Sequence, residues 1–252
     1  MIFKRFAANL RGQNWSAIVI EFAIVVAGVF VGTWVANWNQ QRTEIGETRQ
    51  MLRNIRPELE ANIALYESII HYYAVTRRYA TTAYAGWRGD RGVSDRDFVI
   101  AAYQASQNDY SATNGSSWSV AFGSDRLRNI ADPQLRHDVG QLMSTDYNVI
   151  EQEIFTDYRR HVRQVIPEDI QDAIREKCGD RRDAAGAQQL PEACSLELPA
   201  DRFAEAAKAL RAHPELVGEL RWHFAAVATY LNNLELFETV SRQAIDRIGK
   251  TT

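Results

Sequence analysis

A run of almost entirely apolar residues from Trp15 to Trp38, WSAIVIEFAIVVAGVFVGTWVANW, constrains this chain more than any other part of its sequence. The run has one ionisable side chain, Glu21. Its 24 residues would span about 36 Å as an α-helix, which exceeds the hydrocarbon core of about 30 Å. Trp15, Trp34 and Trp38 occupy the positions of interfacial aromatic anchors. The run is too long and too uniformly apolar for a buried core helix, so it predicts a transmembrane helix over residues 14–39 that contacts the lipid bilayer.

The flanks of this run favour an uncleaved signal-anchor over a cleaved signal peptide. The apolar stretch exceeds the usual signal-peptide core of about 7–15 residues, and bulky tryptophans stand where a cleavage site needs small residues. The preceding segment, residues 1–13, has three basic residues and no acidic one: Lys4, Arg5 and Arg11. This charge favours a short cytoplasmic tail. Three arginines also follow the run closely, so basic residues alone do not fix the orientation: Arg42, Arg49 and Arg53.

The two cysteines supply a second indication of orientation. Cys178 and Cys194 bracket a polar stretch containing glycine and proline, which is typical of a loop. A disulfide between them would close a ring of about 17 residues and stabilise the fold by about 3 kcal/mol. It would also require an oxidising compartment such as the periplasm, whereas the alternative is two unpaired thiols. The spacing excludes a CxxC motif. We expect the disulfide, and therefore a periplasmic domain over residues 40–252 of a bacterial inner-membrane protein.

Polar and small residues of the apolar run share one side of the predicted helix. At 100° per residue, five positions fall within about 20° of one line along it: Asn14, Glu21, Gly28, Gly32 and Asn39. The two glycines form a GxxxG motif, which allows two helix backbones to approach closely. A carboxylate facing lipid is unfavourable, so this stripe predicts packing against another transmembrane helix. Two alternatives remain: Glu21 extends to the cytoplasmic headgroups, or it carries protons.

The residues after Asn39 predict an all-α domain. The helical period continues without a break to GWRGDRG at 86–92, and Pro57 is the one interruption before it. Further helices are expected over 95–107 with Ser94 as N-cap, 125–130, 132–166, 168–177, 199–212 and 216–248. Several have one apolar face. The pattern therefore predicts that the transmembrane helix continues into an antiparallel helical bundle.

Motifs of known chemistry are absent from the sequence. The formal net charge of −3 supplies no basic field for nucleic acid. The five histidines lack metal-ligand spacing, so no metal site is predicted. The sequence has no P-loop, no GxGxxG after a strand and no GxSxG. It therefore nominates no catalytic residues and no cofactor, and favours a protein without enzymatic activity.

Three segments resemble an uncharacterised family of bacterial single-pass inner-membrane proteins. The anchor, NWSAIVIEFAIVVAGVFVGTWVANWNQQR over 14–42, is similar to the family pattern NWxAIxIEFxIVVxGVFxGxxVANWNxxR. FGSDRLRNIADPQLR over 122–136 and AHPELVGELRWHFAAVATYLNNLE over 212–235 are similar to its short-helix and last-helix motifs. The resemblance implies an inner-membrane location and a helical C-terminal domain, and it implies no activity.

Three functions fit these observations. The first is a membrane-anchored scaffolding or interaction protein, either a homo-oligomer or an accessory subunit of a membrane assembly. The second is an ion-coupled subunit of a transport or motor-like complex that uses Glu21. The third is a periplasmic helical sensor, which would need a separate partner because residues 1–13 are too few for an output domain.

Overall fold

The computed structural model describes residues 15–111, 113, 125–145, 151–184 and 186–251. The fold is all-α, as the sequence predicts, and its one sheet within the described part is a two-stranded hairpin. In chain order the elements are α2 (Trp15–Arg88), α3 (Asp95–Gln104), the 3₁₀ turn η1 (Asp125–Leu127), α5 (Pro133–Ser144), α7 (Asp157–Val165), α8 (Glu168–Cys178), β1 (Arg181–Arg182), β2 (Gln188–Gln189), α9 (Ala200–Arg211) and α10 (Glu215–Thr251).

Helix α2 extends over 74 residues and passes through Pro57 without ending. Proline removes one N–H from the helical ladder, and the surrounding helix absorbs this loss. Two compact units share α2 between them, Met1–Gln50 and Met51–Thr252. The described part of the first unit is the apolar helix, and the second unit is the helical bundle. We describe each separately.

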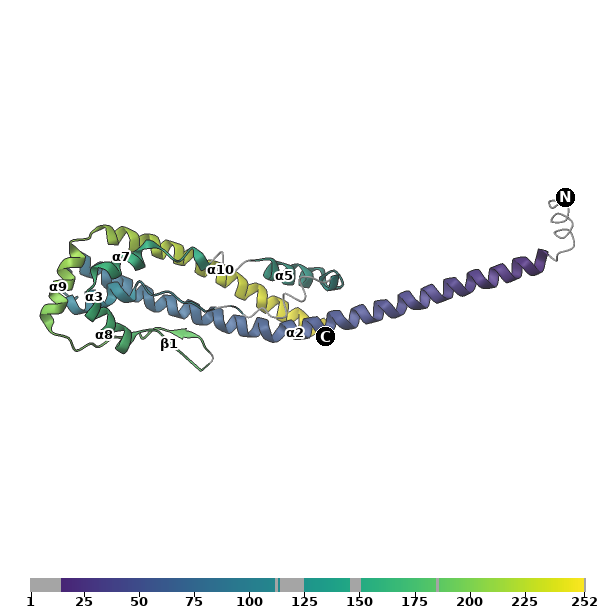
Figure 1. Cartoon of the computed structure of the whole chain (residues 1–252), viewed down its shortest axis with the longest axis horizontal. Helices are drawn as coiled ribbons and strands as arrows, with labels where there is room; N and C mark the ends of the chain where they lie inside the picture. Colours follow the sequence, from purple (N-terminus) through teal and green to yellow (C-terminus); the bar gives the residue numbers. More distant parts are fainter. Residues whose placement is uncertain (1–14, 112, 114–124, 146–150, 185, 252) are drawn as a thin grey trace, which may run out of the picture. The chain divides into compact units, whose positions relative to one another are not determined.

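In the second unit, α2 and α10 pack side by side in opposite directions (Figure 1). Tyr66 of α2 contacts Phe237 with ring centroids 6.3 Å apart, and Tyr73, further along α2, contacts Tyr230, earlier in α10, at 6.0 Å. The order of these contacts is reversed between the helices, which confirms the predicted antiparallel bundle. Their buried aromatic and aliphatic side chains form one core together with those of α3, α5, α7, α8 and α9.

Helices α3 and α9 pack together at the end of α2. Trp87 meets the buried ring of Phe98 edge-on at 5.1 Å and donates its indole N–H to Leu210 O at 3.0 Å. Gly86 makes this packing feasible, because a Cβ there would overlap the Phe98 side chain at less than 3.0 Å. The glycine therefore sets how closely α3 approaches α2.

Two predicted helix starts are confirmed by their caps. The Ser94 hydroxyl accepts a hydrogen bond from Asp97 N, and Asp132 accepts from Gln134 N and Leu135 N immediately before Pro133. These side chains satisfy N–H groups that have no partner within their helices.

The long helix predicted over 132–166 is wrong. α5 ends at Ser144, and α7 begins only after Thr156, whose backbone is extended (φ −87°, ψ 165°). The Thr156 hydroxyl lies 2.9 Å from His223 Nδ1 instead of capping its own helix. A contact to α10 thus holds this residue outside the helix, which the apolar period does not show. α3 also ends at Gln104, before the predicted Gln107. The next residues form a turn, and the Gln107 side chain accepts hydrogen bonds from Arg159 and Arg163 of α7.

Candidate functional site

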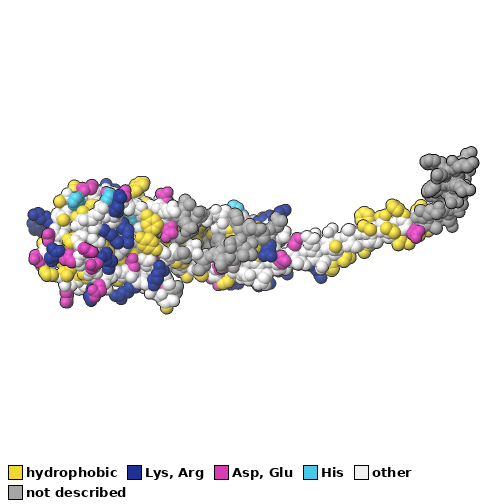
Figure 2. Space-filling model, in the orientation of Figure 1, with side chains coloured by type: hydrophobic (Ala, Val, Ile, Leu, Met, Phe, Trp, Pro, Cys, Tyr) yellow, Lys and Arg dark blue, Asp and Glu magenta, His cyan; other side chains and the backbone are white. Residues whose placement is uncertain are grey.

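The apolar half of α2 has the exposure expected of a helix that contacts lipid. α2 is the one helix in the described part that is long and apolar enough to cross a membrane, and none of its apolar stretch is buried in the structure. Hydrophobic side chains follow one another along this part of α2, whereas acidic and basic side chains mix over the bundle (Figure 2). Phe22 and Phe30 are each 70% exposed. Rings of this size left in water are unfavourable, so this surface needs an apolar environment.

Four of the five stripe positions lie within the described part of α2, and Asn14 lies outside it. Glu21 and Asn39 are exposed, and Gly28 and Gly32 have no other atoms within 4 Å of the position a Cβ would take. Helical geometry keeps all four on one side of α2. No described residue hydrogen-bonds to Glu21. The stripe is therefore open along its length to a second helix.

Two of the predicted interfacial anchors, Trp34 and Trp38, lie where the apolar part of α2 ends. Trp34 is 69% exposed and Trp38 49%, and the guanidinium carbon of Arg42 lies 4.2 Å from the Trp38 ring centroid. The pair of an indole ring and a guanidinium has an apolar side and a charged side. Such a pair is stable at a membrane–water boundary, where the ring contacts lipid and the charge contacts water. The side chain of Trp15 and the predicted tail over 1–13 lie outside the described residues.

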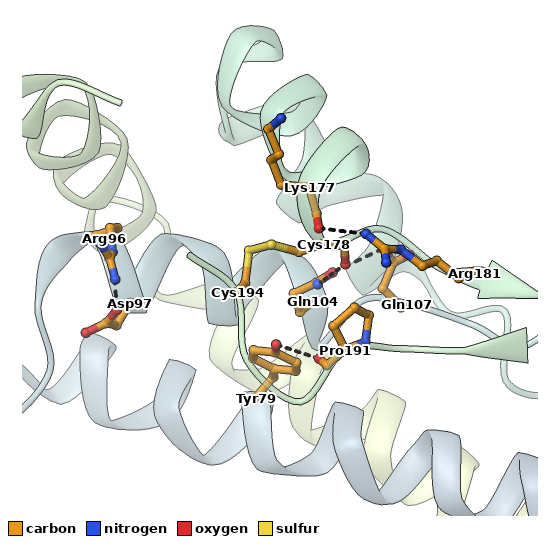
Figure 3. The surroundings of a disulfide bond; sticks show 10 residues. All are labelled: Tyr79, Arg96, Asp97, Gln104, Gln107, Lys177, Cys178, Arg181, Pro191 and Cys194. Atoms are coloured by element: carbon orange, nitrogen blue, oxygen red, sulfur yellow. Dashed lines mark hydrogen bonds and ion pairs between the residues drawn. A yellow bond between two sulfur atoms is a disulfide. The ribbon is translucent and has the colours of Figure 1, made fainter. Parts of the chain in front are cut away.

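The bundle contains the predicted disulfide. Cys178 at the end of α8 is joined to Cys194 beyond β2, with Cα atoms 5.4 Å apart (Figure 3). The sequence predicts this loop as irregular, but Arg181–Arg182 pairs with Gln188–Gln189 in a short antiparallel hairpin. The ring closed by the disulfide thus contains an ordered turn.

Hydrogen bonds hold both ends of the disulfide loop against α2 and α3. The fully buried Gln104 amide donates to Cys178 O at 2.7 Å, and Tyr79 OH donates to Pro191 O at 2.8 Å (Figure 3). Between them, Tyr72 OH donates to Asp180 Oδ1 at 2.8 Å. Burial and the nearby Asp180 carboxylate keep the pKa of Tyr72 far above its usual value, so this phenol stays a donor.

A layer of buried polar groups continues beneath the loop, in the segment after α3. Arg159 of α7 donates to Ser106 O at 2.7 Å and to Gln107 Oε1 at 3.0 Å, and Arg163 donates to the same Gln107 oxygen at 2.8 Å. Burial, and then the neighbouring Arg159, lower the pKa of Arg163. Such an array fixes one arrangement of α3 against α7, because each partner would be unsatisfied in any other. Sequence reasoning missed it, since its members are scattered along the chain.

Asn108 and Asp109 lie within this layer and keep unpartnered atoms. Asn108 is fully buried, and in the described part of the chain neither its Nδ2 nor its Oδ1 has a hydrogen-bond partner. Asp109 Oδ1 accepts from Ser111 N at 2.8 Å, while its Oδ2 has no partner. Burial raises the pKa of Asp109, which favours its neutral form.

The histidines serve separate local contacts. His161 pairs with Glu219 and His213 with Glu215, each at 2.7 Å, while His71 and His137 are exposed. His223 is fully buried in α10, and burial lowers its pKa to about 4. Within the described ranges, no group of three or more histidine, cysteine, aspartate or glutamate side chains is arranged to hold a metal ion.

Comparisons of the chain with known protein families, with curated proteins and with solved structures find no match. The resemblance of the anchor and of the two later segments to a bacterial inner-membrane family therefore stays a prediction.

Proposed function

We propose that this chain is a single-pass membrane-anchored scaffolding or interaction protein. Its apolar helix spans the bacterial inner membrane and associates with another transmembrane helix, and its helical bundle stands in the periplasm. The partner helix belongs either to a second copy of the chain or to a foreign subunit of a membrane assembly.

The observation that carries this proposal is the open stripe on α2. Beyond the helix's own backbone, no described atom lies within 4 Å of where a Cβ would stand on Gly28 or Gly32, and Glu21 lies on the same side of the helix without a described partner. In a bilayer, small residues let a second backbone approach closely, and a polar side chain gains a hydrogen-bond partner across the interface. Packing against a second helix would meet both requirements together.

The experiment compares the size of the complex formed by variant chains, using native gel electrophoresis of membranes extracted in mild detergent. Gly28→Leu and Glu21→Ala act on the stripe and are expected to shift the chain from the assembled to the monomeric band. Ala23→Leu is the matched control, since it introduces the same leucine side chain about 200° away around the helix from Glu21. The proposal is contradicted if both stripe variants still assemble as the wild type does. It is also contradicted if Ala23→Leu loses assembly as much as the stripe variants do.

The proposed orientation rests on the basic residues before the span and on the disulfide. Cys178–Cys194 supports an oxidising compartment for the bundle. Alkaline phosphatase fused after Thr252 matures only where disulfides form, so the fusion is expected to be active in cells. If the phosphatase fusion is inactive, and a reporter that is active only in the cytoplasm works at the same position, the bundle lies in the cytoplasm.

A second candidate is an ion-coupled subunit of a transport or motor-like complex. The observation that favours it is Glu21 itself, an ionisable side chain inside an apolar span with no described hydrogen-bond partner. Ion coupling needs a carboxylate that ionises, whereas helix packing needs only a polar side chain of that shape. Glu21→Gln separates the two functions: it preserves assembly under the first proposal and abolishes ion-driven activity of the assembly under the second.

A further inference from the structure

A groove runs between the segment leading into α7 and the first turns of α10. Its volume is about 650 Å³, within the usual range of about 300–1,000 Å³ for small-molecule sites. Nine residues line it: Gln152, Glu153, Phe155, Thr156, Asp157, Tyr158, Gly218, Glu219 and Trp222. It belongs entirely to the bundle, and its chemistry is separate from that of the membrane anchor.

Aromatic side chains form the apolar part of this groove. Trp222 is 68% exposed and Phe155 is 45% exposed, while Tyr158 is fully buried and donates its hydroxyl to Ala102 O at 2.9 Å. Phe155 is also stacked on Tyr110, with ring centroids 5.5 Å apart. Indole and phenyl rings that stay exposed on a well-packed domain mark a surface that contacts something else. Their faces attract cations.

Carboxylates supply the polar part, and the groove lining contains neither lysine nor arginine. Asp157 is paired with Arg160 at 2.7 Å, so its charge is already balanced. Glu219 pairs through Oε1 with His161 Nδ1 at 2.7 Å, and its Oε2 is buried without a hydrogen-bond partner among the described residues. Glu153 is exposed at the rim. Glu153 and Glu219 therefore make the lining electronegative, with no lysine or arginine among its members to balance them.

The groove walls are tied together before any ligand arrives. Thr156 Oγ1 lies 2.9 Å from Nδ1 of the buried His223, so a hydrogen bond joins the start of α7 to α10. Because burial lowers the pKa of His223 to about 4, this imidazole is neutral near pH 7 and places no positive charge behind the groove. A preformed site loses little conformational entropy on binding.

We propose that this groove binds a small organic cation of the guanidinium or alkylammonium class. The cationic group lies beside the carboxylates of Glu153 and Glu219, and the apolar body of the ligand lies against Trp222 and Phe155. A guanidinium or ammonium beside these rings combines a charge-assisted hydrogen bond with a cation–π contact. The carboxylates would repel an anion, and a neutral apolar ligand would gain no electrostatic attraction from them.

The test uses the full chain in lipid nanodiscs and isothermal titration calorimetry. The probes are N-acetyl-arginine amide and N-acetyl-lysine amide, compared with the neutral N-acetyl-citrulline amide, which keeps the shape of the arginine probe and lacks its charge. At least one cationic probe is expected to bind saturably with a stoichiometry of one per chain. The citrulline probe is expected to bind at least about tenfold more weakly, which corresponds to the loss of one charge-assisted contact.

Two variants change the groove and one serves as control. Glu219→Gln removes the charge and keeps the size of the side chain, and Trp222→Ala removes an exposed ring whose loss leaves the core unchanged. Each is expected to weaken binding of the cationic probe at least about tenfold. Glu235→Gln removes an exposed carboxylate about 24 Å further along the same helix and is expected to bind as the wild type does.

The proposal is overturned by any of three results. These are no saturable binding of either cationic probe, equal binding of the citrulline probe, or unchanged binding in both groove variants. Circular dichroism melting of each variant confirms that it is folded. The Trp222→Ala variant keeps the test decisive if Glu219→Gln disturbs the His161 contact.

Discussion

Replacing Gly86 with alanine tests the packing of α3 on α2 through a single methyl group. The added Cβ would overlap the Cβ, Cγ and Cδ2 atoms of Phe98 at distances under 3.0 Å. Phe98 is fully buried, with Trp87 edge-on to its ring and the Arg211 guanidinium 5.0 Å from its centroid, so the ring has no free space to enter. Relief therefore requires α3 to move away from α2.

The magnitude follows from two opposing effects. Overpacking of a core costs about 1–3 kcal/mol, and three overlapping atom pairs place this substitution near about 3 kcal/mol. Alanine gains about 1 kcal/mol over glycine in helix propensity, so the net loss in the free energy of unfolding is about 2 kcal/mol. For a bundle of this size the midpoint of thermal unfolding falls by about 2–4 °C per kcal/mol, that is, by about 4–8 °C.

The assay is thermal unfolding of the full chain in detergent, followed by far-ultraviolet circular dichroism at a fixed scan rate. The matched control is Gly140→Ala in α5, where a Cβ would meet no atom within 4 Å. The control is expected to gain about 0.5–1 kcal/mol from helix propensity alone. If the Gly86→Ala chain melts at or above the wild-type temperature, Gly86 is not required for the close packing of α3 on α2.

Three further substitutions test the bundle. Replacing Cys178 and Cys194 together with serine is expected to lower the free energy of unfolding by about 3 kcal/mol, measured by denaturant titration, and reductant then has no further effect on the variant. Tyr72→Phe is expected to destabilise by about 1–3 kcal/mol in the same titration, because Asp180 loses its phenol donor. The pKa of His223 is about 4 in the folded chain and about 6.5 in the unfolded chain. This difference contributes about 3 kcal/mol to the free energy of unfolding; the contribution is complete above pH 6.5 and is lost as pH falls toward 4. Between about pH 7.5 and 4.5 the wild type is therefore expected to lose more stability than His223→Gln, and equal losses would contradict the assignment.

Local signals in the sequence predicted much of this fold because they act within a few residues. Ser94 and the Asp132–Pro133 pair cap their helices with side chains two or three positions away from the N–H groups they satisfy. The length and uniform apolarity of Trp15–Trp38 likewise predict a membrane-length helix without reference to any other element. The disulfide was predicted from the polar loop between its two cysteines, which are close in sequence.

Features that depend on contacts between distant elements were not predicted. The gap before α7 exists because Thr156 bonds to His223, which lies 67 residues away, and the apolar period of the segment continues across it. Gln107 leaves α3 and accepts from Arg159 and Arg163, more than 50 residues later. The groove near Glu219 combines two such segments. Composition and periodicity carry no information on these pairings.

The glycine and glutamate stripe of the anchor is proposed to pair with another transmembrane helix. The most direct test is native mass spectrometry of the chain isolated from its own membrane in mild detergent. We expect a complex of defined mass above that of the 28.6 kDa chain, either a multiple of that mass or a fixed ratio with a foreign subunit. We also expect that Gly28→Leu reduces this mass to the monomer while Ala23→Leu does not. A wild-type chain that is isolated only as the monomer would contradict this pairing.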